Sequence, residues 1–289
     1  MPELPEIETV KLQLEKELKG FICKECEIVK ARSVHGNAGL VNNKKVIGVR
    51  RKAKVLILDF EKGISAAFHF KMTGQLILIT GNKKRRVVGG HPTADFTGEL
   101  PSKHTRAIFH FDRGTMYFND QRLFGWVKFG TTEEINNMDF LKKLGPEPSE
   151  LTEKEFMEKI IKYKKPIKLV LMDQEILSGM GNIYANDALW EAGIDPKRPA
   201  NSLTAKQLKA LYRAVILVLK EGIKYGGATA ADAKYINLHG MGGHYQEHFR
   251  VYDREGEECL RPDCGKAGGI IHRFALGGRG TYYCPRCQV

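Results

Sequence analysis

The chain has 289 residues, of which 42% are hydrophobic and 28% charged, a composition typical of a soluble globular protein with about two domains. No apolar run reaches about 18 residues, so the sequence contains no candidate transmembrane helix. The net charge of +12 favours a polyanionic partner such as nucleic acid, and the acidic start without an apolar signal core predicts a cytoplasmic protein.

The first part of the chain is predicted to be a helix followed by a strand-rich domain. Residues 5–19 carry apolar side chains at helical spacing, and Gly20 can end that helix. From about residue 22 to 130, short β-type runs such as VLILDF, ISAAFHF, QLILI and AIFHF alternate with turn residues, which is typical of a β-sandwich. The basic, glycine-rich stretch 81–103 is predicted to be a loop.

The second part is predicted to be helical. The run LGPEPSELTEKE at 144–155 marks the boundary, and Thr204 and Gln207 form a candidate capping box. A glycine-rich segment at 226–246 precedes a cysteine-bearing tail. We therefore expect an α+β fold with a first domain at 1–132, a linker at 133–150, a helical domain at 151–244 and a metal-binding tail at 245–289. The helices are expected at 152–163, 168–177, 182–193 and 204–223.

Four cysteines in the tail have the spacing of a metal site. Cys259 and Cys264 form one close pair, and Cys284 and Cys287 form another after nineteen intervening residues. Two thiolate pairs joined by a loop can surround tetrahedral zinc and leave no open coordination position, so the predicted zinc ion is structural. The alternative is four unrelated buried cysteines.

Cys23 and Cys26 share the local spacing of a metal-binding pair but lack a second pair nearby. In a regular strand these two side chains would point to opposite faces of the sheet. The pattern favours two ordinary, partly buried cysteines over a second metal site.

The start of the chain, MPELPEIETV, combines a proline at position 2 with carboxylates at Glu3 and Glu6. Removal of the initiator methionine would leave the secondary amine of Pro2 as the N-terminus. Such an amine titrates near pH 8, so a neutral fraction can attack a sugar C1′ carbon and form an iminium. By itself, however, the pattern favours a proline and an acidic first turn at the start of a helix over a reactive amine.

Several motifs elsewhere in the chain help to interpret the residues at its start. The runs MPELPEIETV, RKAK (51–54), KMTGQL (71–76), DQRLFG (120–125), LMDQEILSGMGNIYANDALW (171–190) and GRGTYYCPRCQ (278–288) resemble those of bacterial formamidopyrimidine-DNA glycosylases. The resemblance runs in order from residue 2 to 288. It implies a β-sandwich catalytic domain, a helix–two-turns–helix DNA-binding domain and a zinc-finger hairpin.

The resemblance also implies an enzyme that excises 8-oxoguanine and ring-opened purines from double-stranded DNA and then cuts the strand by β- and δ-elimination. Pro2 would be the Schiff-base nucleophile, Glu3 the proton donor at the sugar and Glu6 a supporting carboxylate. Lys54 matches the lysine of β-elimination, and Arg279 matches a hairpin arginine that contacts the phosphate and assists δ-elimination. The implied protein is a monomer of the bacterial cytoplasm, associated with the nucleoid.

Further positions match DNA contacts of the family. An enzyme that acts on a base must take the base out of the stack, and an apolar wedge with a cation can fill the gap. The matching trio is Met72, Arg122 and Phe124, whereas Asn182, His104 and Lys168 match contacts to the DNA backbone.

Some residues depart from the family pattern. The first cysteine pair has four intervening residues and the loop between the pairs is longer than usual, which puts the placement of Arg279 in doubt. A basic position of the family falls on Tyr163, between Lys162 and Lys164.

Two alternatives remain. Endonuclease VIII-like glycosylases share the implied nucleophile but prefer oxidised pyrimidines. They typically have glycine at the fourth residue, where this chain has Leu4. A non-catalytic DNA-binding zinc-finger protein would be expected to lack Pro2, Glu3 or Lys54, and all three are present.

Overall fold

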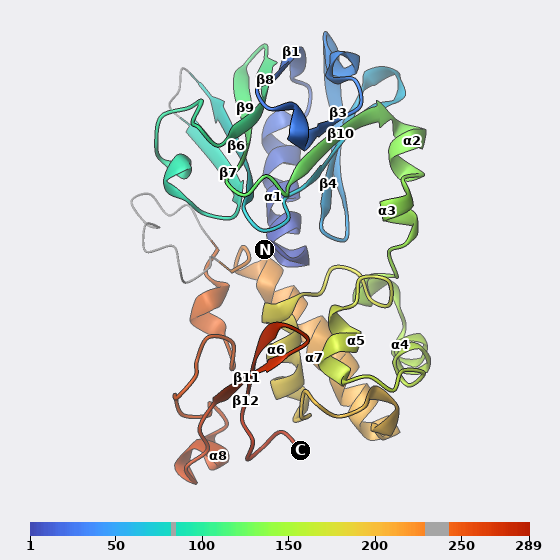
Figure 1. The fold of residues 1–289 in the computed structure, drawn as a ribbon, viewed down its shortest axis with the longest axis vertical. Coiled ribbons are helices and arrows are strands. Elements are labelled where there is room, and N and C mark those ends of the chain that lie inside the picture. The colour runs from blue at the N-terminus through green and yellow to red at the C-terminus, as the bar shows by residue number, and fades with distance from the viewer. Residues whose placement is uncertain (82–84, 229–242) are drawn as a thin grey trace. The chain divides into compact units, whose positions relative to one another are not determined.

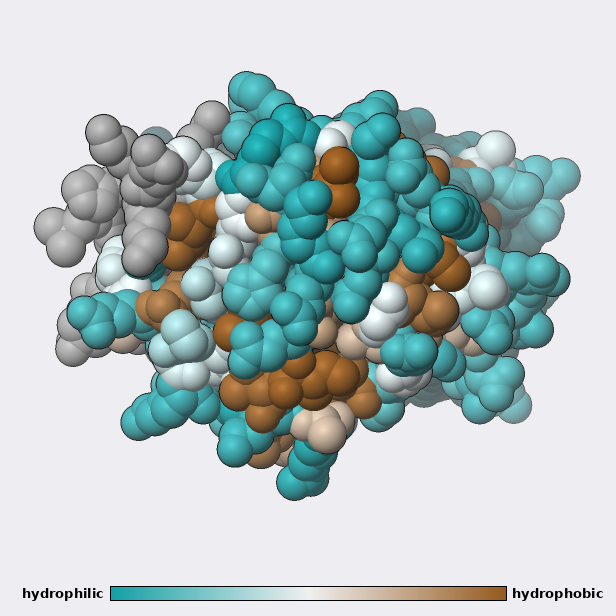
Figure 2. Space-filling view, turned by 90° about the horizontal axis from the view of Figure 1, so that it is seen from above, coloured by the Kyte–Doolittle hydropathy of each residue, from teal (hydrophilic) through white to brown (hydrophobic). Residues whose placement is uncertain are grey.

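The computed structural model describes residues 1–81, 85–228 and 243–289 (Figure 1). They form two compact units. The first comprises Met1–Lys142 with the described part of Tyr225–His244, and the second comprises Lys143–Lys224 with Tyr245–Val289. The described residues contain no helix that is long and apolar enough to cross a membrane. Figure 2 shows a face covered mainly by hydrophilic residues, with smaller hydrophobic patches between them.

The first unit is built on a ten-stranded ladder with the order β2-β10-β5-β4-β3-β1-β8-β9-β6-β7 in the described residues. Only two residue pairs join β1 to β3, so the ladder consists of two halves. The halves face each other as a sandwich: Phe68 of β5 contacts Phe109 of β8 and Phe118 of β9, with ring centroids 5.6 and 5.8 Å apart. The strands are β1 (Ile22–Ile28), β2 (Val34–His35), β3 (Lys44–Lys52), β4 (Val55–Phe60), β5 (Ile64–His69), β6 (Gly74–Thr80), β7 (Arg85–Gly90), β8 (Thr105–Phe111), β9 (Gly114–Asp120) and β10 (Trp126–Thr131).

Helix α1 (Leu4–Leu18) packs against β3 of one half and β7 of the other (Figure 1). Its buried side chains Ile7, Val10 and Leu14 join the core of the sandwich. The predicted helix at 5–19 and the predicted strands are therefore confirmed. Two further short helices of this unit are α2 (Thr132–Asn136) and α3 (Asp139–Lys142).

Three details differ from expectation. The stretch 81–103 contains the edge strand β7, which pairs with β6 along its whole length. Cys23 and Cys26 both point into the core, because a register shift between Cys23 and Glu25 inserts an extra residue in β1. The described part of Tyr225–His244 belongs with the first unit and not with the helical domain, because Ala228 hydrogen-bonds Glu6 of α1.

The second unit is helical and ends in a two-stranded hairpin. The capping box of Thr204 and Gln207 is confirmed, with Gln207 N donating to Thr204 Oγ1 at 3.3 Å. Gly222 of α7 lets Tyr184 of α6 pack against the helix backbone, since a Cβ there would lie 2.5 Å from the tyrosine ring. The elements are α4 (Glu153–Ile160), α5 (Ile167–Met172), α6 (Asn182–Ala192), α7 (Ala205–Lys224), α8 (Pro262–Lys266), β11 (His272–Leu276) and β12 (Arg279–Tyr283).

Candidate active site and zinc site

The start of the chain is buried instead of frayed. Pro2 is buried and Glu3 is only 3% exposed, although Met1 is exposed. The Glu6 carboxylate fastens this start, because Oε2 accepts the Glu3 N–H at 2.7 Å and Oε1 accepts the Ala228 N–H at 2.7 Å. Glu6 therefore acts here as a brace between α1 and the segment around Ala228.

Lys54 lies in the turn between β3 and β4 and is 4% exposed. Its neighbour Ala53 has a positive φ of 51°, a conformation that residues other than glycine rarely adopt. Arg51 holds this turn to the first helix: Nη1 donates to the Ala53 carbonyl at 2.9 Å, and Nε pairs with Glu8 of α1 at 2.7 Å. The arginine thus ties the hairpin that carries Lys54 to the helix that begins just after Pro2 and Glu3.

A histidine that the sequence did not single out lies beside Lys54. Burial, together with the smaller effect of the Lys71 and Lys54 charges, lowers the pKa of His69 to about 3. Lys71 N donates to Nδ1 of His69 at 2.9 Å, so the neutral ring carries its proton on Nε2. The only sequence signal was its place just before KMTGQL, at the end of a buried strand.

The residues of the expected wedge lie in two turns of the first unit. Met72 is in the turn between β5 and β6, and Arg122 and Phe124 are in the turn between β9 and β10. Phe124 is 52% exposed, and the Arg122 guanidinium lies 5.0 Å from its ring centroid. An exposed aromatic ring with a stacked cation is unusual for a core residue and is suited to insertion between bases.

His104 is held by a carboxylate from a neighbouring loop. Its Nδ1 donates to Oδ2 of Asp95 at 2.9 Å, and Asn119 also bonds that oxygen, at 3.4 Å. This pairing fixes the ring orientation and leaves Nε2 for another partner. Asp95 lies in the stretch that was expected to be an irregular loop, and no local pattern indicated its contact with His104.

In the second unit, Asn182 is the first residue of α6, directly after the GMG turn. The start of a helix, where backbone N–H groups point along the axis, suits an anion such as phosphate. Arg279 begins β12 after a two-residue turn of Gly277 and Gly278, which have φ values of 57° and 72°. The hairpin therefore forms despite the longer loop between the cysteine pairs.

Lys168, which was expected to contact the DNA backbone, lies beneath the hairpin strand β12. Its side chain is fully buried, and Nζ donates to the Gly280 carbonyl at 2.9 Å and to Thr281 Oγ1 at 2.7 Å. The lysine thus binds the hairpin strand next to Arg279. Sequence alone could not separate this role from phosphate binding, because both need a cation.

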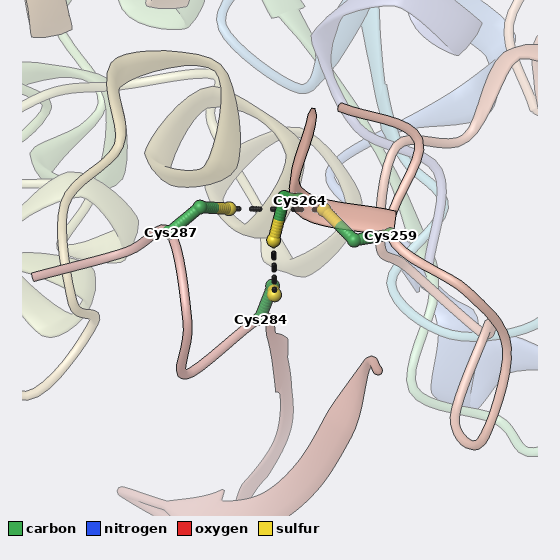
Figure 3. Close-up of side chains that lie close together, drawn as sticks. All are labelled: Cys259, Cys264, Cys284 and Cys287. Carbon is green, nitrogen blue, oxygen red and sulfur yellow. Dashed lines mark hydrogen bonds between the residues drawn. The ribbon is translucent and has the colours of Figure 1, made fainter. Parts of the chain in front are cut away.

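The four tail cysteines converge on one point (Figure 3). Their sulfur atoms all lie within 4.8 Å of one another, with Cys259–Cys287 at 3.7 Å and Cys264–Cys284 at 3.5 Å. Tetrahedral zinc with Zn–S bonds of about 2.3 Å requires sulfurs about 3.8 Å apart. The donor set therefore fits one structural zinc ion, as predicted, whereas Cys23 and Cys26 lie in the sandwich core.

Comparisons with known proteins agree with this arrangement. The model of the formamidopyrimidine-DNA glycosylase N-terminal domain matches residues 1–127, that of the H2TH domain of the same glycosylase matches 144–234, and a zinc finger found in FPG and IleRS matches 256–289. A formamidopyrimidine-DNA glycosylase of Pelotomaculum thermopropionicum is 36% identical over 100% of this chain and 99% of its own length. One of Thermus thermophilus is 34% identical over 100% and 98%.

Solved structures show the same similarity. The Lactococcus lactis Fpg in complex with DNA containing an abasic site superposes with a TM-score of 0.84 at 31% identity, covering 100% of both chains. A mutant of that protein bound to DNA containing Fapy-dG gives a TM-score of 0.85 at 32% identity, covering 99% of both chains. The chain thus belongs to the formamidopyrimidine-DNA glycosylase family.

Proposed function

We propose that this protein is a bifunctional DNA glycosylase and AP lyase of base excision repair that removes oxidised purines from double-stranded DNA. The observation that carries the proposal is the buried start of the chain. Pro2 and Glu3 stand at the head of α1, and Arg51 ties that helix to the turn that presents Lys54. The expected nucleophile, acid and second amine therefore belong to two elements of the first unit that Arg51 joins.

The proposed reaction begins once Met1 has been removed, because only then is the Pro2 nitrogen an amine. Its lone pair attacks C1′ of the damaged nucleotide, and the base departs with the electron pair of the glycosidic bond. Glu3 protonates the ring oxygen O4′ as the sugar opens, and loss of the amine proton leaves a C1′=N⁺ iminium. Glu6 keeps the chain start in place through its two backbone hydrogen bonds.

Strand cleavage follows from the acidity of the iminium. Loss of a C2′ proton expels the 3′ phosphate by β-elimination, assisted by Lys54, and a further proton loss expels the 5′ phosphate by δ-elimination. Arg279 on the zinc-finger hairpin would hold that phosphate. Met72, Arg122 and Phe124 would fill the gap in the stack, and His104 and Asn182 would bind the backbone. We assign Lys168 to support of the hairpin, because it is buried there.

The net charge of +12 suits a DNA partner that is held largely through its phosphates. We propose that the protein works as a monomer in the bacterial cytoplasm, at the nucleoid. The zinc ion would supply no chemistry, since four thiolates fill its coordination sphere and it serves only to fold the hairpin.

Borohydride trapping tests the nucleophile. The reagent reduces the iminium to a stable amine, so lesion DNA should become covalently attached to a chain whose first residue is Pro2 by N-terminal sequencing. Pro2→Gly keeps a primary amine and should trap weakly while releasing base far more slowly. Normal turnover in that variant would refute the assignment, and the absence of any adduct from the processed wild type would favour a non-catalytic DNA-binding protein.

The lesion class is tested by comparing single-turnover excision from duplexes with 8-oxoguanine opposite cytosine and with thymine glycol. We expect faster release of 8-oxoguanine, in keeping with Leu4 at the fourth position. One solved complex of the Lactococcus lactis Fpg contains DNA with an oxidised pyrimidine, so relative rates decide this question better than binding does. Faster release of thymine glycol would assign the protein to the endonuclease VIII type.

A further inference from the structure

One buried carboxylate joins the two turns that carry the wedge residues. Asp120 is the last residue of β9 and has no exposed surface. Its Oδ1 accepts the hydroxyl of Thr73, the residue after Met72, at 2.5 Å. The same oxygen accepts the Arg122 N–H at 3.2 Å, and Oδ2 accepts the Gly125 N–H at 2.7 Å. Three donors from two different turns therefore converge on one side chain.

The two turns are also bonded to each other. The Arg122 N–H lies 3.1 Å from Thr73 Oγ1, so Thr73, Asp120 and Arg122 form a closed set of hydrogen bonds. Thr73 is 8% exposed, so this set is shielded from water. A hydrogen bond to an ionised group in such a setting is stronger than one between neutral groups.

Both turns contain a residue in an unfavourable backbone conformation. Lys71, next to Met72, has a φ of 48°, and Leu123, between Arg122 and Phe124, has a φ of 58°. Side chains other than glycine persist in this region only where the surroundings hold them. The hydrogen bonds to Asp120 lie two residues after Lys71 and on both sides of Leu123, which are the places where such a restraint is needed.

Asp120 is itself fixed by the neighbouring strand. Its carbonyl accepts Nε of Arg106 at 2.8 Å, and its N–H donates to the His104 carbonyl at 2.9 Å. Arg106 is 5% exposed. The carboxylate therefore has little freedom to follow a moving turn.

We propose that Asp120 is a positioning residue for base extrusion, which holds Met72 in register with Arg122 and Phe124 before DNA binds. This inference rests on the proposed function, because the wedge role of the three residues is part of it. A wedge that is already ordered loses little conformational entropy when it enters the base stack, whereas loose turns must be ordered in the rate-limiting complex.

The first test is Asp120→Asn, which keeps the shape but turns one acceptor into an N–H group that faces N–H or O–H donors. Asp112→Asn, in the exposed turn between β8 and β9, is the matched control. Single-turnover release of 8-oxoguanine should slow by about 10- to 100-fold in Asp120→Asn, the range expected for misplaced groups. Cleavage at a preformed abasic site, which has no base to extrude, should slow much less. Extrusion is followed separately by the fluorescence of a 2-aminopurine placed next to the lesion.

A second pair covers the case in which Asp120→Asn does not fold. Thr73→Val removes the bridging hydroxyl and keeps the side-chain shape, and Thr73→Ser retains the hydroxyl. Thr73→Val should slow the 2-aminopurine signal and base release, and Thr73→Ser should recover most of the loss. Normal extrusion in Thr73→Val, or equal slowing in both Thr73 variants, would overturn the role of the hydrogen-bonded set.

Failure of the wedge assignment can be recognised separately. The triple variant Met72→Ala, Arg122→Ala, Phe124→Ala removes the wedge itself, and unchanged extrusion in it would refute the proposed role of the trio. If the triple variant is slow while Asp120→Asn and Thr73→Val are normal, the wedge stands and the positioning role of Asp120 is wrong.

Discussion

The indole Nε1 of Trp190 donates a hydrogen bond to Sγ of Cys259 at 3.3 Å. This contact joins α6 directly to the zinc site. Arg261 reinforces it, because its guanidinium lies 5.0 Å from the Trp190 ring and donates to the carbonyls of Trp190 and Glu191. Hydrogen bonds to metal-binding groups orient those groups and tune the metal site. The end of α6 is therefore part of the support of the zinc ion.

Loss of zinc should be visible in the fluorescence of Trp190. Cys284→Ser should release about one zinc equivalent and unfold the hairpin, since ligand geometry and local folding are coupled. Trp190 is 8% exposed, so its emission should shift to longer wavelength when the hairpin unfolds and exposes the indole to water. Trp190→Phe in the same background leaves only Trp126, whose emission should not change. Retention of stoichiometric zinc by atomic absorption would show that these cysteines are not the site.

The unfolding should stop near residue 252. Tyr245 is fully buried against Tyr184, and the buried carboxylate of Asp187 accepts the N–H groups of 250, 251 and 252. Hydrogen exchange should therefore show lost protection after residue 252 in Cys284→Ser and normal protection before it. Global unfolding would mean that the metal supports far more than the hairpin.

Glu3→Gln should separate the two chemical steps. The amide keeps the shape of the side chain but cannot donate the acidic proton, so base release should fall by about 100-fold or more, the usual contribution of a positioned acid. Strand cleavage at a preformed abasic site should fall less, because no base has to leave and the free sugar can open its ring without the proton of Glu3. Glu15→Gln, on the exposed side of the same helix, is the control. Equal losses on both substrates would indicate a structural role for Glu3.

Lys168→Met distinguishes support of the hairpin from direct phosphate contact. Each lost phosphate contact reduces the slope of log affinity against log salt by about 1. We expect Arg279→Ala to lower the slope by that amount. Because Lys168 donates to the hairpin strand beside Arg279, the double variant should lower the slope no further. Additive slopes in the double variant would restore Lys168 as a phosphate contact.

His69 should make the first unit sensitive to acid. Burial lowers the pKa of His69 to about 3, whereas the unfolded imidazole titrates near 6.5. Between these values the unfolded chain binds more protons, so stability falls as the pH falls from 6.5 toward 3. The loss at pH 5 should be about 2 kcal/mol. Urea unfolding at pH 7 and pH 5 measures it, with His69→Gln expected to remove the difference and the exposed His35→Gln expected to keep it.

Much of the fold could be read from the sequence, because buried strands and amphipathic helices leave clear hydrophobic patterns. Strand β7 could not, since Arg85–Gly90 lies at a sheet edge and is rich in charge and glycine. The shared inward direction of Cys23 and Cys26 depends on a bulge that changes no residue type. A local sequence pattern does not predict features that depend on backbone geometry, such as this bulge or the edge position of β7.

The residues of the candidate site also differ in how far the sequence alone predicted them. The zinc ligands were predicted from spacing alone, because metal geometry constrains spacing. The roles of Pro2, Glu3 and Lys54 came from resemblance and remain proposals. The roles of Asp95 and Asp120 were not predicted, because sequence does not distinguish a buried aspartate from an exposed one. Their roles depend on hydrogen-bond partners at distant positions in the chain. The burial of Lys168 under the hairpin was hidden for the same reason.

The hydrogen bond between Glu6 and Ala228 has a consequence for how the protein is made. The first unit is interrupted by the 82 residues from Lys143 to Lys224, which belong to the second unit. At ribosomal speeds of about 5 to 20 residues per second, the partner of Glu6 emerges about 5 to 20 seconds after the sheet has been synthesised. The hydrogen bond between Ala228 and Glu6 at the start of α1 therefore cannot form until most of the helical unit has been synthesised. A nascent chain stalled before residue 228 would carry the proposed nucleophile without the hydrogen bond that holds the start of α1, so this end of the protein is completed late although it is translated first.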